Sequence, residues 1–223
     1  GYFHMNDSNT NVGGWKDSSM RKTLLGNSKT PTSPLANSLM AALPSDLRAV
    51  MKSVTKYTDN VGNATGSVAG NVTATTDYLF LLAEFEVFGS RYYANDYERN
   101  SQLQYDYYKA SNSRVAYKHN ATGTAVWWWL RSPNYNNNNN FCNVNTGSSN
   151  NNNANNGKGV FAAILDHVNQ KGTCNAEGHL FRFHGESYGM KPNATTGGTD
   201  AFVHAHGPRT IRAYHVPNPV QPW

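Results

Sequence analysis

The sequence is poor in charge and contains no long apolar run. Asp, Glu, Lys and Arg make up 15% of its 223 residues, too few for a coiled coil or for a charged tail that coats nucleic acid. No apolar run approaches the roughly 20 residues of a membrane helix, so we expect no membrane insertion. The net charge of +5 is spread along the chain, and we therefore expect no nucleic-acid partner.

Cysteine is also scarce, with two in the chain. Cys142 and Cys174 allow at most one disulfide, and the alternative is a buried free thiol at Cys142. The chain begins at Gly1 and not at Met, so we expect a processed product or a part of a longer polypeptide.

Asparagine is the residue in excess. The chain contains 30, and 14 of the 23 residues in 134–156, the asparagine tract, are asparagine. Such a tract is typical of a disordered linker, or it is a codon-repeat expansion with no binding role. Because this one follows an apolar stretch and contains the insert FCNV, we interpret it as loop, strand and loop. Alternation places Phe141 and Asn143 on one face of that strand. Cys142 and Val144 lie on the other.

Two short helices are predicted before the middle of the chain. The first covers 38–43 and ends at Pro44, and Ser45 takes the N-cap position of the second. The apolar residues of the second helix share one face at helical spacing: Leu47, Val50, Met51 and Val54. The other expected elements are loops and short strands over 1–30, a loop over 58–76, a buried strand or short buried helix over 78–89, a helical turn over 103–110 and a strand over 125–131.

The last part of the chain has a different composition. Residues 161–223 hold six of the eight histidines and five of the nine prolines. The β-like runs in this part are 161–165, 180–183, 201–206 and 210–216. We therefore expect one domain over 1–165, with 161–165 as its last strand, and a β-rich extension over 166–223.

A series of short motifs carries a family resemblance. In chain order they are GGWK at 13–16, MR at 20–21, ALPSDL at 42–47, LFLLAEFEVFG at 79–89, WWLRSP at 128–133, FCNV at 141–144 and GKGV at 157–160. The series resembles a surface-protein domain common in gut Firmicutes and their phages. The resemblance implies an α+β, C-type-lectin-like fold, close to the variant named after the formylglycine-generating enzyme. Members of that family usually end soon after the Gly-Val pair, so residues 166–223 depart from the pattern.

The resemblance also implies a variable surface. Some members of the family look like target proteins of diversity-generating retroelements, in which an RNA template is copied with errors at adenines. Asn codons are rich in adenine, so an unmutated template would encode an Asn-dense stretch after the WWLRSP-like strand, with Phe141, Cys142, Val144 and Gly147 as fixed spacers. The predicted ligand-binding residues are Asn134, Tyr135, Asn136, Asn137, Asn138, Asn139, Asn140, Asn143, Asn145, Asn150, Asn151, Asn152, Asn153, Asn155 and Asn156.

These patterns predict a binding protein and not an enzyme. We expect non-covalent recognition of a host cell-surface protein or glycan by a diversifiable surface, on a phage tail or virion or at a cell surface. A homo-oligomer, with a trimer as one possibility, would add avidity. The alternative is a structural virion or cell-surface component whose C-terminal extension mediates assembly.

One motif in the extension resembles part of a catalytic site. GESYG at 185–189 matches the nucleophile elbow of serine hydrolases, and Asp200 and later histidines supply the other triad residue types. About 60 residues cannot build a hydrolase sheet, however, and Pro192 stands where the helix after Ser187 should run. We therefore expect a Gly-bounded turn.

Histidine and tryptophan clusters give the remaining candidates. His204 and His206 share a strand face, and the histidines that could join them are His179, His184 and His215. Without a paired motif we expect hydrogen-bonded or surface histidines, and neither a metal nor a cofactor. The three tryptophans at 127–129 could form a sugar platform, but alternation turns at least part of them inward, so we expect core packing.

Overall fold

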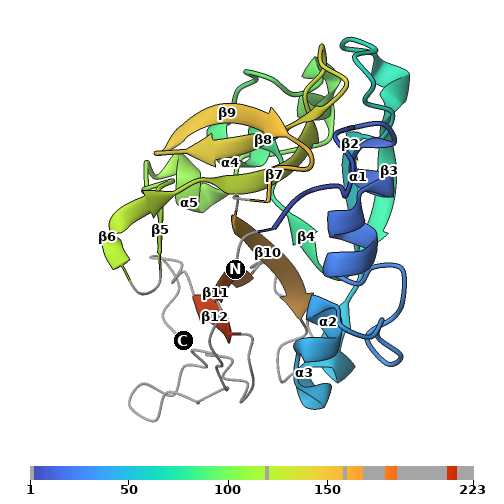
Figure 1. Cartoon of the computed structure of the whole chain (residues 1–223), viewed down its shortest axis with the longest axis vertical. Coiled ribbons are helices and arrows are strands. Elements are labelled where there is room, and N and C mark those ends of the chain that lie inside the picture. The colour runs from blue at the N-terminus through green and yellow to red at the C-terminus, as the bar shows by residue number, and fades with distance from the viewer. Residues whose placement is uncertain (1–2, 119–120, 158–159, 168–178, 185–209, 215–223) are drawn as a thin grey trace.

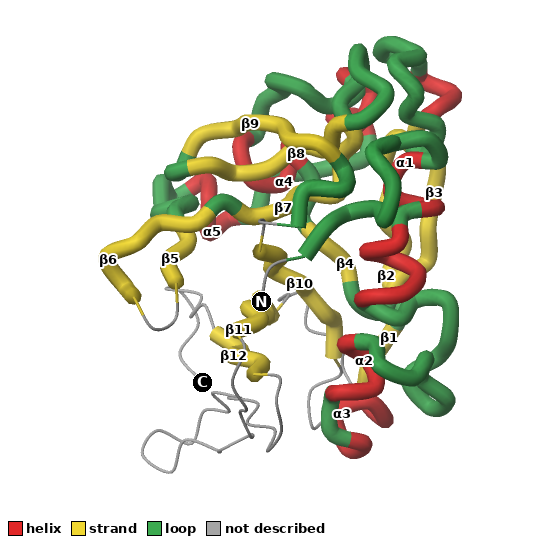
Figure 2. Tube along the Cα trace, viewed as in Figure 1, coloured by secondary structure: helices red, strands yellow, loops and turns green. Residues whose placement is uncertain are grey.

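The computed structural model describes residues 3–118, 121–157, 160–167, 179–184 and 210–214. These residues form a mixture of short helices and strands (Figure 1). The helices are α1 (Gly14–Asp17), α2 (Leu39–Ala42), α3 (Ser45–Val50), α4 (Glu84–Phe88) and α5 (Asp106–Lys109), with a π-helical turn over Met20–Leu24 and 3-10 turns over Ala69–Asn71 and Asp96–Asn100. Loops make up much of the chain between them (Figure 2).

The main sheet has eight strands, six of which lie on one continuous path. Its main path runs β12 (Thr210–Tyr214), β11 (His179–His184), β10 (Val160–His167), β7 (Trp128–Pro133), β8 (Asn140–Asn145) and β9 (Ser148–Asn153). The pairing of β10 with β7 is parallel, and the other pairings on this path are antiparallel. β9 therefore lies at one edge of the sheet, with β8 between it and the fully buried β7.

Shorter strands attach around this sheet. β1 (Met51–Lys52) and β4 (Phe80–Leu81) both pair antiparallel with β10, which runs from β7 toward α2 and α3 in Figure 1. Separate antiparallel hairpins join β2 (Val54–Asp59) to β3 (Val72–Asp77) and β5 (Ala116–Lys118) to β6 (Ala121–Val126).

The apolar core lies between the sheet and the N-terminal segments. Trp15, Trp129 and Phe141 are among its largest fully buried side chains. The Trp129 Nε1 donates a hydrogen bond to the Phe3 carbonyl at 2.7 Å, and the Met5 amide donates to the Ala154 carbonyl at 2.8 Å. The start of the chain is thus fixed against the end of the asparagine tract.

A buried charged network crosses the same core. The Arg131 guanidinium donates to both carboxylate oxygens of Glu86, at 2.5 and 2.9 Å, and to the Thr58 hydroxyl at 2.8 Å. Its backbone amide donates to the Leu82 carbonyl, at the irregularity where β7 leaves the ladder with β8. Such a break in register re-aims a side chain, and here Arg131 has no exposed surface.

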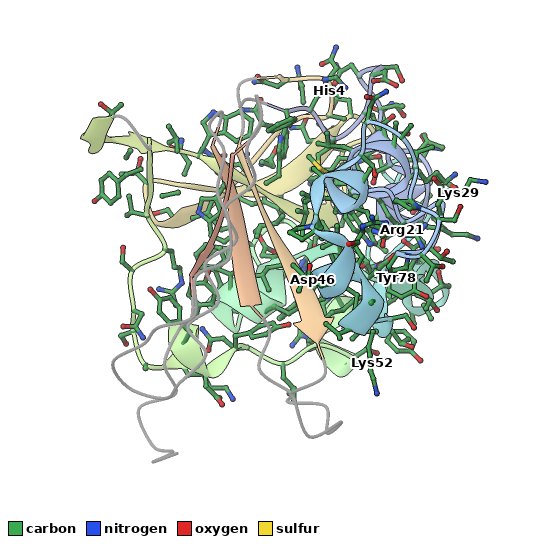
Figure 3. All side chains as sticks on the ribbon, turned by 90° about the horizontal axis from the view of Figure 1, so that it is seen from below. His4, Arg21, Lys29, Asp46, Lys52 and Tyr78 are labelled. Atoms are coloured by element: carbon green, nitrogen blue, oxygen red, sulfur yellow. The ribbon has the colours of Figure 1, made fainter. Side chains whose placement is uncertain are left out.

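A second acidic residue, Asp77, organises the N-terminal half. It accepts hydrogen bonds from the Trp15 Nε1 at 2.9 Å and from the Arg21 Nε at 2.6 Å. Figure 3 shows Arg21 and Tyr78 close together on this part of the molecule. The motif residues Trp15 and Arg21 therefore hold the end of β3.

Several predicted elements are confirmed. The helix over 38–43 is α2, the helical turn over 103–110 contains α5, and 161–165 lies within β10. The stretch 78–89 contains both a strand, β4, and a helix, α4. Trp128 and Trp129 are buried in the core and Trp127 is half-buried against it, which excludes an exposed tryptophan platform.

Other element predictions are wrong, and tertiary pairing explains the main ones. The second helix ends at Val50 because Met51 pairs with β10, and Val54 belongs to β2. The loop expected over 58–76 includes β3, whose threonines favour strand structure without an apolar alternation. Ser45 is already helical and Pro44 holds the N-cap.

The N-terminal prediction is wrong in part: the expected loops are present, but α1 and a π-helical turn stand where short strands were expected. In the C-terminal part, β11 and β12 coincide with two of the expected β-like runs. The run 201–206 lies outside the described residues. The proposed boundary at 165 stays a prediction.

Candidate functional site

The asparagine tract consists of a loop over 134–139 followed by the β8–β9 hairpin. The insert FCNV lies in β8, as predicted. The second Asn run does not form a loop, because Asn150 to Asn153 pair with β8 along β9. Pairing with a buried strand supplies the backbone partners that the weak strand preference of asparagine does not. The tract is therefore loop, strand, turn and strand.

Asn11, which lies outside the tract, binds the backbone of the loop at the start of the tract through hydrogen bonds. Its Nδ2 lies within hydrogen-bonding distance of the carbonyl oxygens of Asn134, Asn137 and Asn140, at 3.3, 2.6 and 2.9 Å. Its backbone amide donates to the Asn138 carbonyl at 2.9 Å. Asn11 has no exposed surface, so a single buried residue binds the loop backbone at four positions.

Asn11 is in turn held by the segment after β2. Its Oδ1 accepts a hydrogen bond from the Asn63 amide at 2.8 Å. Gly62 has a φ of +61°, and a Cβ there would lie 2.2 Å from the Asn11 carbonyl oxygen. Only glycine fits at this close approach, so the position of Asn11 depends on the backbone around it.

Tyr135 anchors the other side of the loop. Its amide donates to the Tyr93 carbonyl at 2.9 Å, and its carbonyl accepts from the Gly66 amide at 2.9 Å. Its ring lies 3.9 Å from the Arg91 guanidinium, a cation–π contact. Tyr135 is half-buried and therefore contributes more to the loop anchor than to an open surface.

Two side chains inside the loop stabilise its turns. Asn134 Oδ1 accepts from the Asn136 amide at 3.1 Å, and Asn137 Oδ1 accepts from the Asn139 amide at 2.7 Å. These are Asx-turns, in which a side-chain amide substitutes for a backbone partner. Asn134 and Asn137 thus have a structural reason to be asparagine.

The predicted ligand-binding residues fall into three groups by exposure. The exposed residues are Asn136, Asn138, Asn145, Asn153 and Asn155. The half-buried residues are Tyr135, Asn137, Asn139, Asn140, Asn150, Asn151, Asn152 and Asn156. Asn134 and Asn143 are buried, so their prediction as ligand-facing residues is wrong.

Asn143 is buried because β8 is covered on both faces. It lies opposite Trp129 on β7 and keeps 1% of its surface exposed. Its Oδ1 has no hydrogen-bond partner among the described residues. A buried amide oxygen without a partner destabilises the folded state, and no contact in the structure explains why this residue is asparagine.

In the edge strand β9, asparagine side chains accept hydrogen bonds from two of the strand's own backbone amides. The Asn151 amide donates to Asn150 Oδ1 at 2.8 Å, and the Asn153 amide donates to Asn152 Oδ1 at 3.0 Å. Unpaired edges invite pairing with another chain, and proteins protect them in several ways. Here the side chains at 150 and 152 give that protection.

Under the hairpin, Glu84 connects the tract to the loop after α4. Its carboxylate accepts from the amides of Tyr92 and Ala94, at 2.9 and 2.8 Å, and from the Ser149 hydroxyl at 2.5 Å. Sequence reasoning missed Glu84, Asn11 and Arg91. The position of Glu84 within LFLLAEFEVFG, a polar residue in an apolar run, was the one available signal.

Burial affects the titration of groups near this site. Burial raises the pKa of Glu98 to about 7, although hydrogen bonds from the Asp59 amide and the Ser132 hydroxyl act in the other direction. Burial would also raise the pKa of Glu86, but the charges of Arg131 and Lys56 outweigh it and lower that pKa to about 2.

Cys142 is a free, buried thiol. Burial, followed by the negative charges of Glu84 and Glu98, raises its pKa well above the usual value, so it is a poor nucleophile. Its possible disulfide partner, Cys174, belongs to a segment that the structure does not describe.

The other candidate chemistry is largely untested. GESYG at 185–189, Asp200, Pro192, His204, His206 and His215 lie beyond the described parts of the chain, and of His179 and His184 only the backbone, in β11, is described. Within the described residues, no group of three His, Cys, Asp or Glu side chains could hold a metal ion. None of the helices described is both long and apolar enough to span a membrane.

Comparison with known proteins gives one family match. Residues 3–178 match the model of a domain of unknown function (DUF6273). No curated protein and no solved structure matches the chain. The match covers the N-terminal segment, the charged core and the whole asparagine tract, and the chain therefore belongs to the DUF6273 family.

Proposed function

We propose that this protein is a non-enzymatic, C-type-lectin-like display protein whose asparagine tract forms a diversifiable ligand-binding surface. Its ligand would be a host cell-surface protein or glycan, recognised without covalent chemistry. The protein would act on a phage tail or virion or at a cell surface, as a homo-oligomer that adds avidity.

One observation carries the proposal: the loop 134–140 is held through its backbone by residues outside the tract. Asn11, Gly66 and Tyr93 bond main-chain groups, which every side chain leaves in place except proline. The exposed side chains of Asn136 and Asn138 make no hydrogen bond that the fold needs. A surface built this way tolerates sequence change while the scaffold stays rigid.

Asn143 supports the proposal independently. A buried asparagine with an unpartnered Oδ1 has no structural cause, whereas an adenine-rich template codon is a cause that acts on the gene. Asn139 also has an Oδ1 that is buried without a partner among the described residues, whereas the side chain of Asn140 has a structural role, because its Nδ2 donates to Asn151 Oδ1.

The proposal is tested with two libraries displayed on yeast. The first randomises Asn136, Asn138, Asn145, Asn153 and Asn155. The control randomises exposed asparagines outside the tract, Asn9, Asn100 and Asn112. Both are selected on intact cells of several Gram-positive bacterial strains.

We expect the first library to keep its display level and to yield binders that differ from strain to strain. The control library should yield none. Collapse of display across the first library, or equal enrichment of both libraries, would contradict the proposal.

The alternative is a structural component that assembles through residues 166–223. The pairing of β11 with β10, and of β12 with β11, favours a structural role for that part of the chain. Deletion of 166–223 separates the two: loss of the oligomer with retained binding by selected variants fits a display domain with an assembly extension. Loss of both properties fits the structural component alone.

A further inference from the structure

A cleft of about 570 Å³, with both polar and apolar walls, lies beside the anchor of the asparagine tract. Its walls come from α4, the loop after it, the 3-10 turn Asp96–Asn100 and the segment 102–104. The lining residues that matter here are Phe85, Arg91, Asp96, Arg99, Gln102 and Gln104. Its volume is within the range of small-molecule sites. The lining holds several side chains that both orient and discriminate a polar ligand.

Arg91 gives the cleft an uncompensated positive charge. Its Nε donates to the Ala94 carbonyl at 2.9 Å, and its guanidinium is stacked on Tyr135. No carboxylate among the described residues pairs with it, whereas Arg99 forms an ion pair with Asp96. The Arg91 guanidinium is therefore held in place and is suited to a carboxylate, which it can bind through two parallel hydrogen bonds.

Gln102 supplies a side-chain amide oxygen that needs a hydrogen-bond donor, and an anion without an N–H or O–H group cannot provide one. Its Nε2 donates to the Tyr57 carbonyl at 2.8 Å and to Glu98 Oε2 at 2.9 Å, which fixes the orientation of the amide. Its Oε1 has no partner among the described residues, and the side chain is 6% exposed. A buried acceptor of this kind needs a hydroxyl or N–H donor.

Gln104 places a second amide oxygen in the wall. Its Nε2 donates to the Val87 carbonyl at 3.1 Å, and a Cβ at Gly89, where φ is +68°, would lie 2.6 Å from its Oε1. Gly89 thus leaves the space in which this oxygen sits. Among the described residues of its wall, the cleft combines an arginine without a carboxylate partner, Arg91, with amide oxygens that can accept from hydroxyl groups.

We infer that this cleft binds an acidic sugar unit, with its carboxylate on Arg91 and its hydroxyls on the amide oxygens of Gln102 and Gln104. A simple anion would satisfy Arg91 alone, and a neutral sugar would leave Arg91 without a partner. The site is separate from the exposed residues of the tract and does not depend on their diversification.

The test uses the full chain and two probes that differ only at C6, D-glucuronate and D-glucose, in NMR titrations with acetate and N-acetyl-aspartate amide as further probes. We expect glucuronate to bind more tightly than acetate, which lacks the hydroxyls, and at least about tenfold more tightly than glucose, which lacks the carboxylate that Arg91 would bind. Arg91→Ala should remove that preference, Arg91→Lys should retain part of it, and Gln104→Ala should weaken glucuronate but not acetate.

Val50→Ala is the control, because Val50 is an exposed apolar residue that does not line the cleft, and it should change nothing. The amide spectrum of each variant reports whether it is folded. Equal binding of glucose and glucuronate, no effect of Arg91→Ala, acetate as tight as glucuronate, or tighter binding of the aspartate amide would each overturn the inference. The last result would assign the cleft to acidic peptides.

Discussion

Two neighbouring parts of the molecule, β7 and the loop 134–140, are specified in opposite ways. In β7 the side chains carry the structure: Arg131 and Ser132 are fully buried and bonded to Glu86 and Glu98. In the loop the backbone carries it, through Asn11 and the segments near Gly66 and Tyr93. Sequence change should therefore be costly in the first region and cheap at the exposed loop positions Asn136 and Asn138, although the two regions are adjacent in the chain.

The largest expected effect is at Arg131. Arg131→Met leaves Glu86 buried without its bidentate partner, and breaking a buried pair in this way costs about 3–5 kcal/mol. Urea unfolding at pH 7 measures the change. Lys22→Ala is the control, because the Lys22–Asp17 pair is about half exposed and should cost less than about 1 kcal/mol. Similar losses of stability in the two variants would contradict the claim that buried side chains hold β7.

The pH dependence of stability should also come from the charged core. Glu98 binds its proton more tightly in the folded state, so the free energy of unfolding should fall as the pH rises from 4.5 to about 7. Glu86 has the opposite shift, so stability should also fall as the pH drops from 4.5 toward about 2. Glu98→Gln should flatten the upper window by up to about 1 kcal/mol per pH unit.

Unfolding series from pH 2 to 8 check both windows. Asn143→Val serves as the control, because the asparagine tract contains no titratable group except Cys142 and Tyr135, and its pH slope should match that of the original chain. If the free energy of unfolding of Glu98→Gln kept the same dependence on pH, a group other than Glu98 would be responsible for it.

The third effect is at the buried clamp of the loop. Asn11→Ala removes the donor to three loop carbonyls and the acceptor for the Asn63 amide, at a cost of about 2 kcal/mol. Hydrogen exchange should show faster exchange at 134–140 and an unchanged core. Asn9→Ala, at an exposed residue of the same segment, should have no such effect. A silent Asn11→Ala would mean that the loop is held by other contacts.

How much of this contrast the sequence predicts depends on the kind of contact. The apolar content of FCNV correctly predicts a buried strand. The strand expected over 125–131 is correct only in part, because it divides between β6 and β7 and because β7 continues through Ser132 and Pro133. β3 could not be foreseen, because its alternation is of threonine and not of apolar residues. The Asn11 clamp could not either, because its partners are carbonyl groups more than 120 residues away in the chain, and any residue type supplies a carbonyl.

The fourth prediction concerns the one tract residue in the core. Asn143→Val replaces an unpartnered amide with an apolar side chain suited to a strand and should stabilise the protein by about 1 kcal/mol. Asn134→Val is the matched change at a buried Asn that accepts the Asn136 amide, and it should destabilise. Thermal unfolding of both variants tests this prediction. A loss of stability at both positions would show that Asn143 has a structural role.

The smallest effects are expected at the exposed loop residues. Asn136→Ala and Asn138→Ala should each change the free energy of unfolding by less than about 0.5 kcal/mol, because the backbone bonds of the loop remain. Urea unfolding under the conditions used for Arg131→Met gives the direct comparison. A loss above about 1 kcal/mol at either position would show that side chains, too, hold the loop.

The most direct measurement of the central claim is deep sequencing of the encoding gene across its natural population, over codons 130–160. The account predicts substitutions concentrated at the adenines of the Asn codons, most freely at Asn136, Asn138, Asn145, Asn153 and Asn155. Codons for Arg131, Phe141, Cys142 and Val144 should be unchanged. A tract that is invariant, or that changes only in length, would contradict the account and leave a structural surface protein in its place.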